Sequence, residues 1–307
     1  MRALIILSIA LALATQAGCS RPGHGEFASA DAAVEALIKA VKAGDVDALV
    51  GVLGEESRPL VESGDPVQDQ HARERFLEEY EAAHDLTKND AGLTVLEVGA
   101  DKWPFPFPLV EENGHWKFDA TEGAEQIIDR RVGENELFTI KACLAFVDAE
   151  REYYQRNPQQ EPLMQFAQKL VSTEGQKDGL YWPTADGEPE SPVGEAFAAA
   201  QSAGYFQGDT IKGEPFHGYI YEMLEGQGPH AKGGAYSYMV GDKMLGGFAL
   251  LAYPAEYGAS GVMSFMVNHE GVVYSKDLGE KTAEAAAAIE LFDPDDTWKQ
   301  EATIEDQ

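Results

Sequence analysis

Residues 135–154, NELFTIKACLAFVDAEREYY, carry the pattern that decides the fold of the second half of the chain. Large apolar side chains recur there at steps of three and four residues, a spacing that places them on one face of an α-helix. The members of this apolar stripe are Leu137, Ile140, Leu144, Val147 and Tyr154. The pattern predicts a long amphipathic helix whose apolar face packs against another element.

The segments that follow this helix alternate apolar and polar residues in the manner of β-strands. FHGYIYEML, AYSYMV, GGFALLAY, VMSFMV and VVYSK lie between residues 216 and 276. The sequence Asn-His-Glu-Gly at 268–271 supplies a turn between the last two, as expected for antiparallel neighbours. Residues 126–307 are therefore expected to form a long helix packed on an antiparallel β-sheet.

The earlier part of the chain predicts three helices. Ser29 is placed to cap the first helix, and Gly44 is placed to end it. A second apolar stripe follows directly after Gly44. Asp65 is placed to cap a third helix, with proline at its first position and Gln68 completing a capping-box pattern.

Three extended segments, LTVLEVG, WPFPFPLV and HWKFD, come after these helices and predict a small antiparallel sheet. The expected fold class is α+β. Its N-terminal α+β module spans residues 29–125, and the module built from the long helix and its sheet spans residues 126–307.

The stretch WPFPFPLV, residues 103–110, sets prolines at every second position. In an extended chain Trp103, Phe105 and Phe107 share one face, while the prolines share the other. Because proline lacks the N–H that a β-ladder needs, we expect an edge strand here. The aromatic face has two interpretations: it belongs to the core, or it is a platform for a ligand or partner.

The turn after this stretch allows two hairpin registers. A two-residue turn at Asn113-Gly114 places Leu109 opposite Phe118 and unites the apolar faces. A three-residue loop, with Gly114 in a left-handed bulge, turns the proline edge away from the partner strand. Both registers are open at the level of sequence.

The first residues predict export. Arg2 precedes an unbroken apolar run and small residues, as in a signal peptide over residues 1–18, and the run is too short for a spanning helix. Residues 16–19, Gln-Ala-Gly-Cys, are similar to the lipobox of bacterial lipoproteins. We therefore expect lipid on Cys19 and a tether over residues 19–28. The expected location is the periplasmic side of the cell envelope, at the outer rather than the inner membrane.

Composition limits the partners and the chemistry. With 53 acidic and 23 basic residues the net charge is -30, which repels nucleic acid, so no nucleic-acid partner is expected. The histidines show no ligand spacing, which predicts no metal site, and no motif predicts a cofactor or catalytic residues. With Cys19 lipidated, Cys143 has no disulfide partner, and it is expected to be a core residue rather than a nucleophile.

Several pieces of the chain carry a family resemblance: FASADAAVEAL, ESGDPVQD, WPFPFPLV, GHWKFD, RRVGENEL, DGLYWP and FHGYIYEML. With them the chain resembles a family of bacterial exported proteins, domain of unknown function 2950. The N-terminal module is similar to the cone-shaped NTF2-like fold. The later module is similar to the soluble portion of type IV pilin-like proteins.

These scaffolds commonly bind rather than catalyse, so the resemblance implies a binding role. We expect a non-catalytic envelope lipoprotein that binds an envelope protein or a small ligand, or supports assembly. The alternative is a periplasmic enzyme that acts on a small envelope substrate through carboxylates or through a histidine such as His217. A polar cluster inside an apolar pocket would favour the enzyme.

Overall fold

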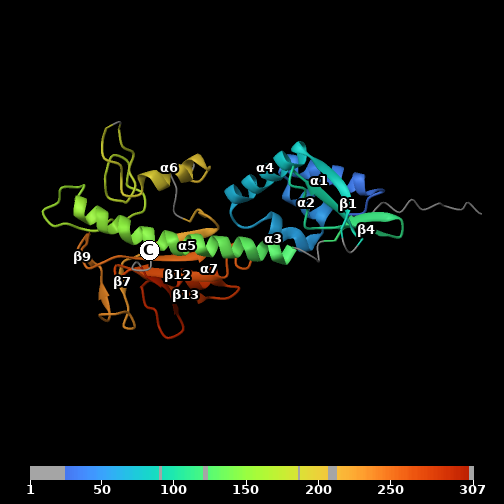
Figure 1. The fold of residues 1–307 in the computed structure, drawn as a ribbon. Coiled ribbons are helices and arrows are strands. Elements are labelled where there is room, and N and C mark those ends of the chain that lie inside the picture. The colour runs from blue at the N-terminus through green and yellow to red at the C-terminus, as the bar shows by residue number, and fades with distance from the viewer. Residues whose placement is uncertain (1–24, 90–91, 120–123, 186, 207–212, 304–307) are drawn as a thin grey trace, which may run out of the picture.

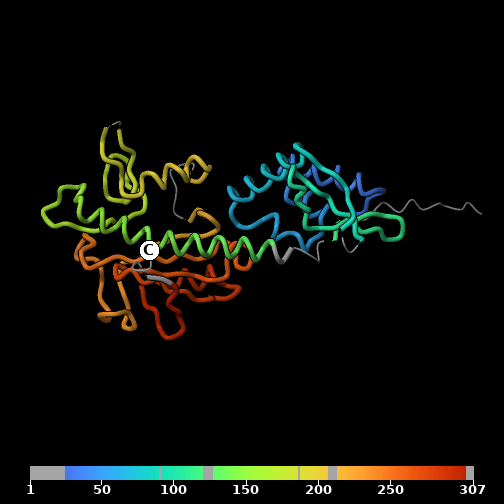
Figure 2. Tube along the Cα trace, viewed as in Figure 1, coloured from blue at the N-terminus to red at the C-terminus, as the bar shows by residue number. Residues whose placement is uncertain are grey.

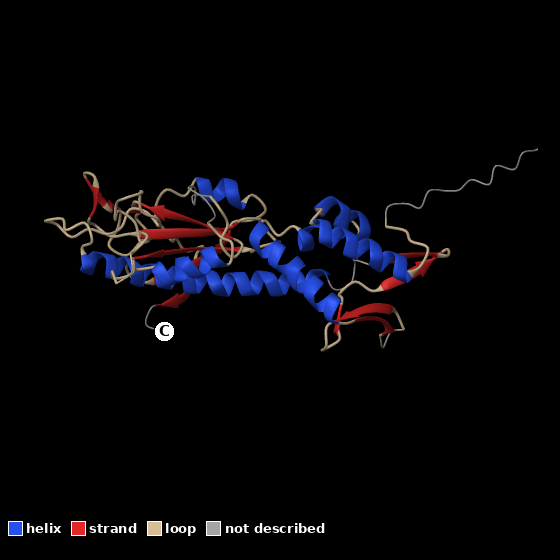
Figure 3. Cartoon of the chain, turned by 90° about the horizontal axis from the view of Figure 1, so that it is seen from above, coloured by secondary structure: helices blue, strands red, loops and turns tan. Residues whose placement is uncertain are grey.

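The computed structural model describes residues 25–89, 92–119, 124–185, 187–206 and 213–303, and it confirms the α+β class (Figure 1). Cys19 and the leader lie outside the described residues. Buried apolar side chains form two clusters, one before residue 119 and one after residue 142. The long helix α5, Ala124–Arg156, extends along both parts of the molecule (Figures 2 and 3).

The N-terminal helices begin and end where the sequence predicts. Ser29 Oγ accepts a hydrogen bond from the N–H of Ala32 at 3.1 Å, and Gly44 ends the first helix with φ 63°. The elements are α1 (Ala30–Ala43), α2 (Val46–Leu53), the 3-10 turn η1 (Glu55–Ser57), α3 (Arg58–Val61) and α4 (Pro66–Ala82). Their apolar faces pack together, because the stripe of α1 is buried against α2 and the small sheet.

The small sheet has the strand order β1-β2-β4-β5, with β3 also paired to β2. Leu109 lies opposite Phe118, and Asn113 and Gly114 both have positive φ, so the two-residue turn is the register adopted. The strands are β1 (His84–Lys88), β2 (Thr94–Val98), β3 (Trp103–Pro104), β4 (Leu109–Glu112) and β5 (His115–Phe118).

The expectation of one edge strand over residues 103–110 is wrong. The chain leaves the ladder after Pro104 and returns at Leu109, and β4 then lies between β2 and β5. The missing proline N–H groups explain the break, since a continuous strand inside the sheet would lack those ladder bonds. Within the break, the N–H of Phe105 still donates to Leu96 O at 2.7 Å.

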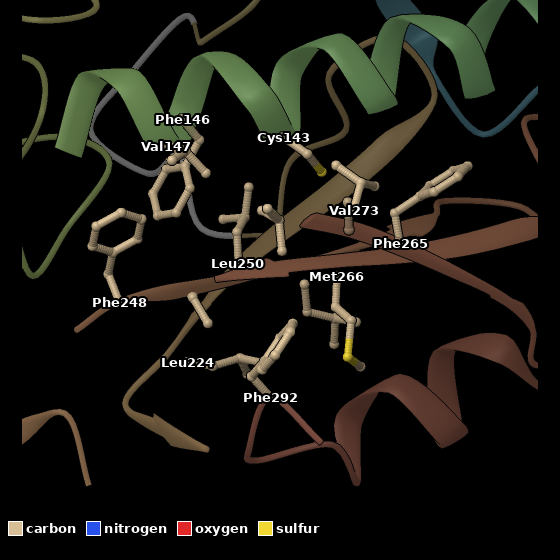
Figure 4. Packing of buried hydrophobic residues seen from close by; sticks show 14 of the residues in the cluster. Cys143, Phe146, Val147, Leu224, Phe248, Leu250, Phe265, Met266, Val273 and Phe292 are labelled. Atoms are coloured by element: carbon tan, nitrogen blue, oxygen red, sulfur yellow. The ribbon is translucent and has the colours of Figure 1, made fainter. Parts of the chain in front are cut away.

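The larger sheet has the antiparallel order β14-β13-β12-β11-β6. Helix α5 packs on one face, and a short helix, α7 (Thr282–Ala287), packs on the other (Figure 4). This confirms the predicted helix on an antiparallel sheet. The strands are β6 (Tyr219–Leu224), β11 (Ala249–Pro254), β12 (Met263–Asn268), β13 (Val272–Asp277) and β14 (Lys299–Thr303).

One short helix and two short hairpins lie outside this sheet in the second half of the chain. The helix α6 (Gly194–Ser202) precedes β6. Two short hairpins follow β6: β7 (Gly226–Gln227) with β8 (Tyr236–Ser237), and β9 (Met239–Val240) with β10 (Lys243–Met244).

The buried face of α5 is rotated from the predicted stripe. Cys143 is fully buried at the centre of the face, as a core residue, whereas Leu137 is 62% exposed (Figure 4). Thr139 and Asn135 occupy the buried positions one and two turns before Cys143, where α5 passes the junction of the two modules. Among the described helices, none is long and apolar enough to cross a membrane.

Candidate ligand-binding site

A cavity of about 380 Å³ lies between the helices of the N-terminal module and the first turns of α5. Its volume falls within the range of about 300–1,000 Å³ that is usual for small-molecule sites. Helices α1, α2 and α3 supply an apolar wall. The wall consists of Leu37, Val41, Leu49, Leu53, Leu60 and Val61.

Two of the three aromatic residues of the predicted platform line this cavity. Trp103 is 47% exposed and lies at the mouth, and Phe105 is half-buried, with its ring centroid 5.3 Å from that of Phe76 on α4. Phe107 is fully buried and packs edge-on against Phe105. Of the three residues, Trp103 and Phe105 thus line the cavity and Phe107 does not, and the strand that was expected to carry all three breaks between Trp103 and Phe107.

Four arginines line the same cavity, together with two acidic residues. Arg131 is committed to structure: its guanidinium donates to the carbonyl oxygens of Pro59 at 2.9 Å and Leu60 at 2.6 Å. Burial lowers its pKa, and the nearby Asp69 opposes that shift. Arg131 therefore fixes α5 against α3.

Arg75 and Arg130 form neither an ion pair nor a hydrogen bond with any residue that the structure describes, whereas Arg73 interacts electrostatically with Asp69. Arg75 and Arg130 are exposed, and Arg73 is half-buried. Arginine without a partner is unexpected in a chain with 53 acidic and 23 basic residues. Guanidinium groups of this kind can form charge-assisted hydrogen bonds with an anion.

The acidic residues at the cavity balance this group only in part, since Asp69 interacts electrostatically with Arg131 and Arg73. Asp69 accepts the N–H of Ser63 at 3.1 Å, and burial raises the pKa of its carboxyl group, against the effect of the hydrogen bonds to Ser63. Glu134 is exposed on α5 and forms no ion pair with a described residue. Two carboxylates thus face four guanidinium groups.

Gln68 supplies a polar element to the cavity wall. Its side-chain N–H donates to Asn135 Oδ1 at 3.0 Å, and Asn135 donates to Ser260 O at 2.9 Å. Gln68 Oε1 is buried without a partner among the described atoms. The predicted capping box is therefore wrong in its second half, because the N–H of Asp65 donates to Ser63 Oγ and Gln68 joins α4 to α5 instead.

The sequence match extends over this whole architecture. A family model described as "Protein of unknown function (DUF2950)" matches residues 24–301. The chain belongs to this family. No curated protein and no solved structure gives a significant match. The similarity of the two modules to NTF2-like and pilin-like folds accordingly stays a prediction.

In this DUF2950 protein His217 interacts electrostatically with the carboxylate of Asp65, which is fully buried. Its Oδ1 accepts the N–H groups of Val67 and Gln68, and its Oδ2 accepts the hydroxyl of Tyr205 at 3.0 Å and the N–H of Gly218 at 2.8 Å. All of its acceptor capacity is used, so Asp65 joins segments rather than serving as a base.

His217 has its own structural role. The centroid of its ring lies 3.9 Å from that of Phe138, with the two rings tilted by 31°, and its φ is 48°. Burial lowers the pKa of His217, and the nearby Asp65 opposes that shift. Over the described ranges, no group of three His, Cys, Asp or Glu side chains could hold a metal ion.

The sequence carries a weak signal of the arginine group that our reasoning from motifs missed. Arg73 and Arg75 are two residues apart, and Arg130 and Arg131 are adjacent, whereas basic residues elsewhere are sparse among acidic ones. Only the fold brings the two pairs together, because α4 and the start of α5 are separated by the small sheet in sequence.

Proposed function

We propose that this protein is a non-catalytic binding module of the bacterial cell envelope, and that its site is the cavity between α1–α4 and α5. One observation carries the proposal: an apolar cavity of ligand size is lined by four arginines, and two of them, Arg75 and Arg130, have no ion-pair or hydrogen-bond partner among the described residues. Apolar walls with a few convergent polar groups are the usual composition of small-molecule sites.

The proposed location rests on the sequence of residues 1–19. Processing after Gly18 and lipid on Cys19 would attach the folded part to the membrane through a short tether, on the periplasmic side and at the outer membrane. In this arrangement the cavity is offered to ligands in the periplasm.

A binding role is favoured over catalysis by the chemistry of the lining. Among the described residues that line the cavity, there is no histidine, cysteine or serine to act as a base or nucleophile. Asp69 is occupied by the Ser63 N–H, and Arg131 is occupied by carbonyl oxygens. The remaining arginines can hold an anion without transforming it.

The first test is binding of a neutral apolar fluorophore, N-phenylnaphthylamine, to the expected mature chain, residues 19–307, which carries Cys19→Ala so that it has neither leader nor lipid and needs no detergent. Ala72 is exposed at the cavity mouth on α4, so Ala72→Phe places a ring across the entrance at little cost in stability. We expect saturable fluorescence enhancement with the parent chain and loss of it with Ala72→Phe.

Ala82→Phe is the matched control, since Ala82 is exposed on the same helix but outside the cavity. It should bind the fluorophore like the parent chain. Absence of saturable binding to the parent, or equal binding by all three proteins, would contradict the proposed site.

A specific observation also favours a protein partner at the other end of the molecule. Leu163 and Val240 are 60% and 59% exposed, and the loop that carries Leu163 lies against the β9–β10 hairpin through the Lys243–Glu161 ion pair at 2.7 Å. Exposed apolar patches mark contact sites. A photo-cross-linking residue at position 163 should capture an envelope protein in cells, and one at exposed Glu174 should not.

A further inference from the structure

We propose that the ligand of the cavity is an anionic amphiphile with a single acyl chain, its head group held by Arg73, Arg75 and Arg130. This inference rests on the proposed binding function and specifies the class of ligand. The head group is a carboxylate or a phosphate, as in a free fatty acid or a lysophospholipid.

The charge of the head group follows from the arginines. The chain as a whole carries a net charge of -30, which disfavours anions near most of its surface. Arg75 and Arg130 have no partner among the described residues. Each guanidinium group can present two parallel N–H donors to a carboxylate or a phosphate, and a neutral ligand gains no charge-assisted hydrogen bond from them. The local charge therefore selects for an anion against the field of the whole protein.

The acyl chain follows from the walls behind the arginines. Leu49, Leu53 and Val61 on one side, and Phe76 and Phe105 on the other, present apolar side chains to the space. A flexible chain fills such a space and is desolvated by it. The volume of about 380 Å³ is near the lower end of the usual range for ligand sites, which favours one chain over two.

The geometry of α4 matches a ligand with two ends. Gln68, Ala72 and Arg75 are separated by four and three residues and so follow one side of the helix. The polar contact of Gln68 with α5 closes one end, and exposed Arg75 marks the other. The acyl chain lies between them, and the head group lies at the solvent end beside Trp103.

The inference is tested by competition against bound N-phenylnaphthylamine with dodecanoate, dodecanol and lauroyl lysophosphatidate. Dodecanoate and dodecanol have the same chain length and differ in charge. We expect at least one of the two anions to displace the fluorophore at a concentration about tenfold lower than dodecanol requires. The tighter anion identifies the source of the head group.

Charge-removing variants separate the arginines from the apolar walls. The double substitution Arg75→Gln with Arg130→Gln should weaken anion binding about tenfold and leave dodecanol and the fluorophore unchanged. Lys141→Gln, at an exposed position of α5 away from the cavity, is the control for net charge and should change nothing. Raising the salt concentration should weaken the binding of the anions and leave the binding of dodecanol and the fluorophore unchanged.

The failures of the two proposals are distinguishable. If the fluorophore binds and Ala72→Phe blocks it, but dodecanol competes as well as both anions, the cavity is a binding site and the anionic class is wrong. The same conclusion follows if the double arginine variant binds the anions like the parent chain. If the fluorophore does not bind, the proposed function itself fails.

Discussion

The hydroxyl of Tyr205 donates a hydrogen bond to the carboxylate of Asp65 at 3.0 Å, and both side chains are buried. The same carboxylate oxygen accepts the N–H of Gly218, which directly precedes β6. Its other oxygen caps α4. Three segments that are far apart in sequence therefore meet at one buried carboxylate, which joins the N-terminal module to the larger sheet.

This junction predicts a difference between two tyrosine variants. Tyr205→Phe should lower the free energy of unfolding by about 2 kcal/mol, because a buried bond to a charged acceptor is lost. Tyr257→Phe removes a longer contact, 3.3 Å, to the exposed Asp277 and should cost less than about 0.5 kcal/mol. Urea denaturation followed by circular dichroism compares them, and equal losses would contradict the role of Asp65.

Glu150 predicts a pH dependence of stability. It is fully buried on α5, its Oε2 accepts the N–H of Ala167 at 2.9 Å, and Oε1 is buried with no partner among the described atoms. Burial raises its pKa well above 4.5, against the effect of the hydrogen bond from Ala167. A raised folded-state pKa means that its contribution to stability is complete below 4.5 and is lost as pH rises through the folded-state pKa.

Glu150→Gln removes this titration while keeping a side-chain oxygen for the Ala167 N–H. At pH 8 the variant should be more stable than the parent chain by about 2 kcal/mol, and the gain should shrink toward pH 4. Glu174→Gln, at an exposed position, should show no such trend. Unfolding free energies measured across this pH range decide the point, and a constant difference would contradict the burial argument.

Arg130 and Arg131 are adjacent, yet substitution by lysine should affect the free energy of unfolding at only one of them. Arg131→Lys should lower the free energy of unfolding by about 1–2 kcal/mol, because an ammonium group cannot reproduce the guanidinium bonds to Pro59 O and Leu60 O. Arg130→Lys should leave stability unchanged, since Arg130 has no partner among the described residues. Parallel urea titrations provide the measurement, and equal effects would show that the bonds to α3 do not hold α5.

Ligand binding should appear as a gain in stability. With dodecanoate at about one hundred times its Kd, the free energy of unfolding of the parent chain should rise by about 2.7 kcal/mol by mass action. The same addition should leave Ala72→Phe unchanged and should stabilise Ala82→Phe as much as the parent. Thermal unfolding at several concentrations of dodecanoate measures this, and a shift shared by Ala72→Phe would indicate binding elsewhere.

Local patterns in the sequence were sufficient for much of the fold. Ser29, Gly44 and Asp65 act at helix ends as predicted, because capping depends on one side chain and the adjacent backbone. The apolar segments after residue 216 became strands. The larger sheet is covered on both faces, so its central strands β11 and β12 are buried along nearly their whole length rather than on alternate residues.

Features that depend on contacts between residues far apart in the sequence could not be predicted from those local patterns. Leu137 fits the helical stripe, yet it is exposed, because the buried side of α5 at that level carries the polar residues Asn135 and Thr139 and Leu137 lies on the opposite side of the helix. Gln68 fits a capping box, yet its side-chain N–H donates to Asn135 Oδ1, 67 residues away in the sequence. The arginine group of the cavity similarly depends on how α4 and α5 approach each other, which no local spacing encodes.

Helix α5 has a mechanical consequence. At about 1.5 Å per residue, its 33 residues form one continuous helix of about 50 Å. It begins at the cavity and ends beyond the larger sheet. A continuous helix resists bending, so a tilt imposed at Arg130 by a bound head group would be carried to the far end rather than absorbed along the way. Under the proposed binding function, occupancy of the cavity is therefore expected to shift the far end of α5, which precedes the exposed loop at Leu163.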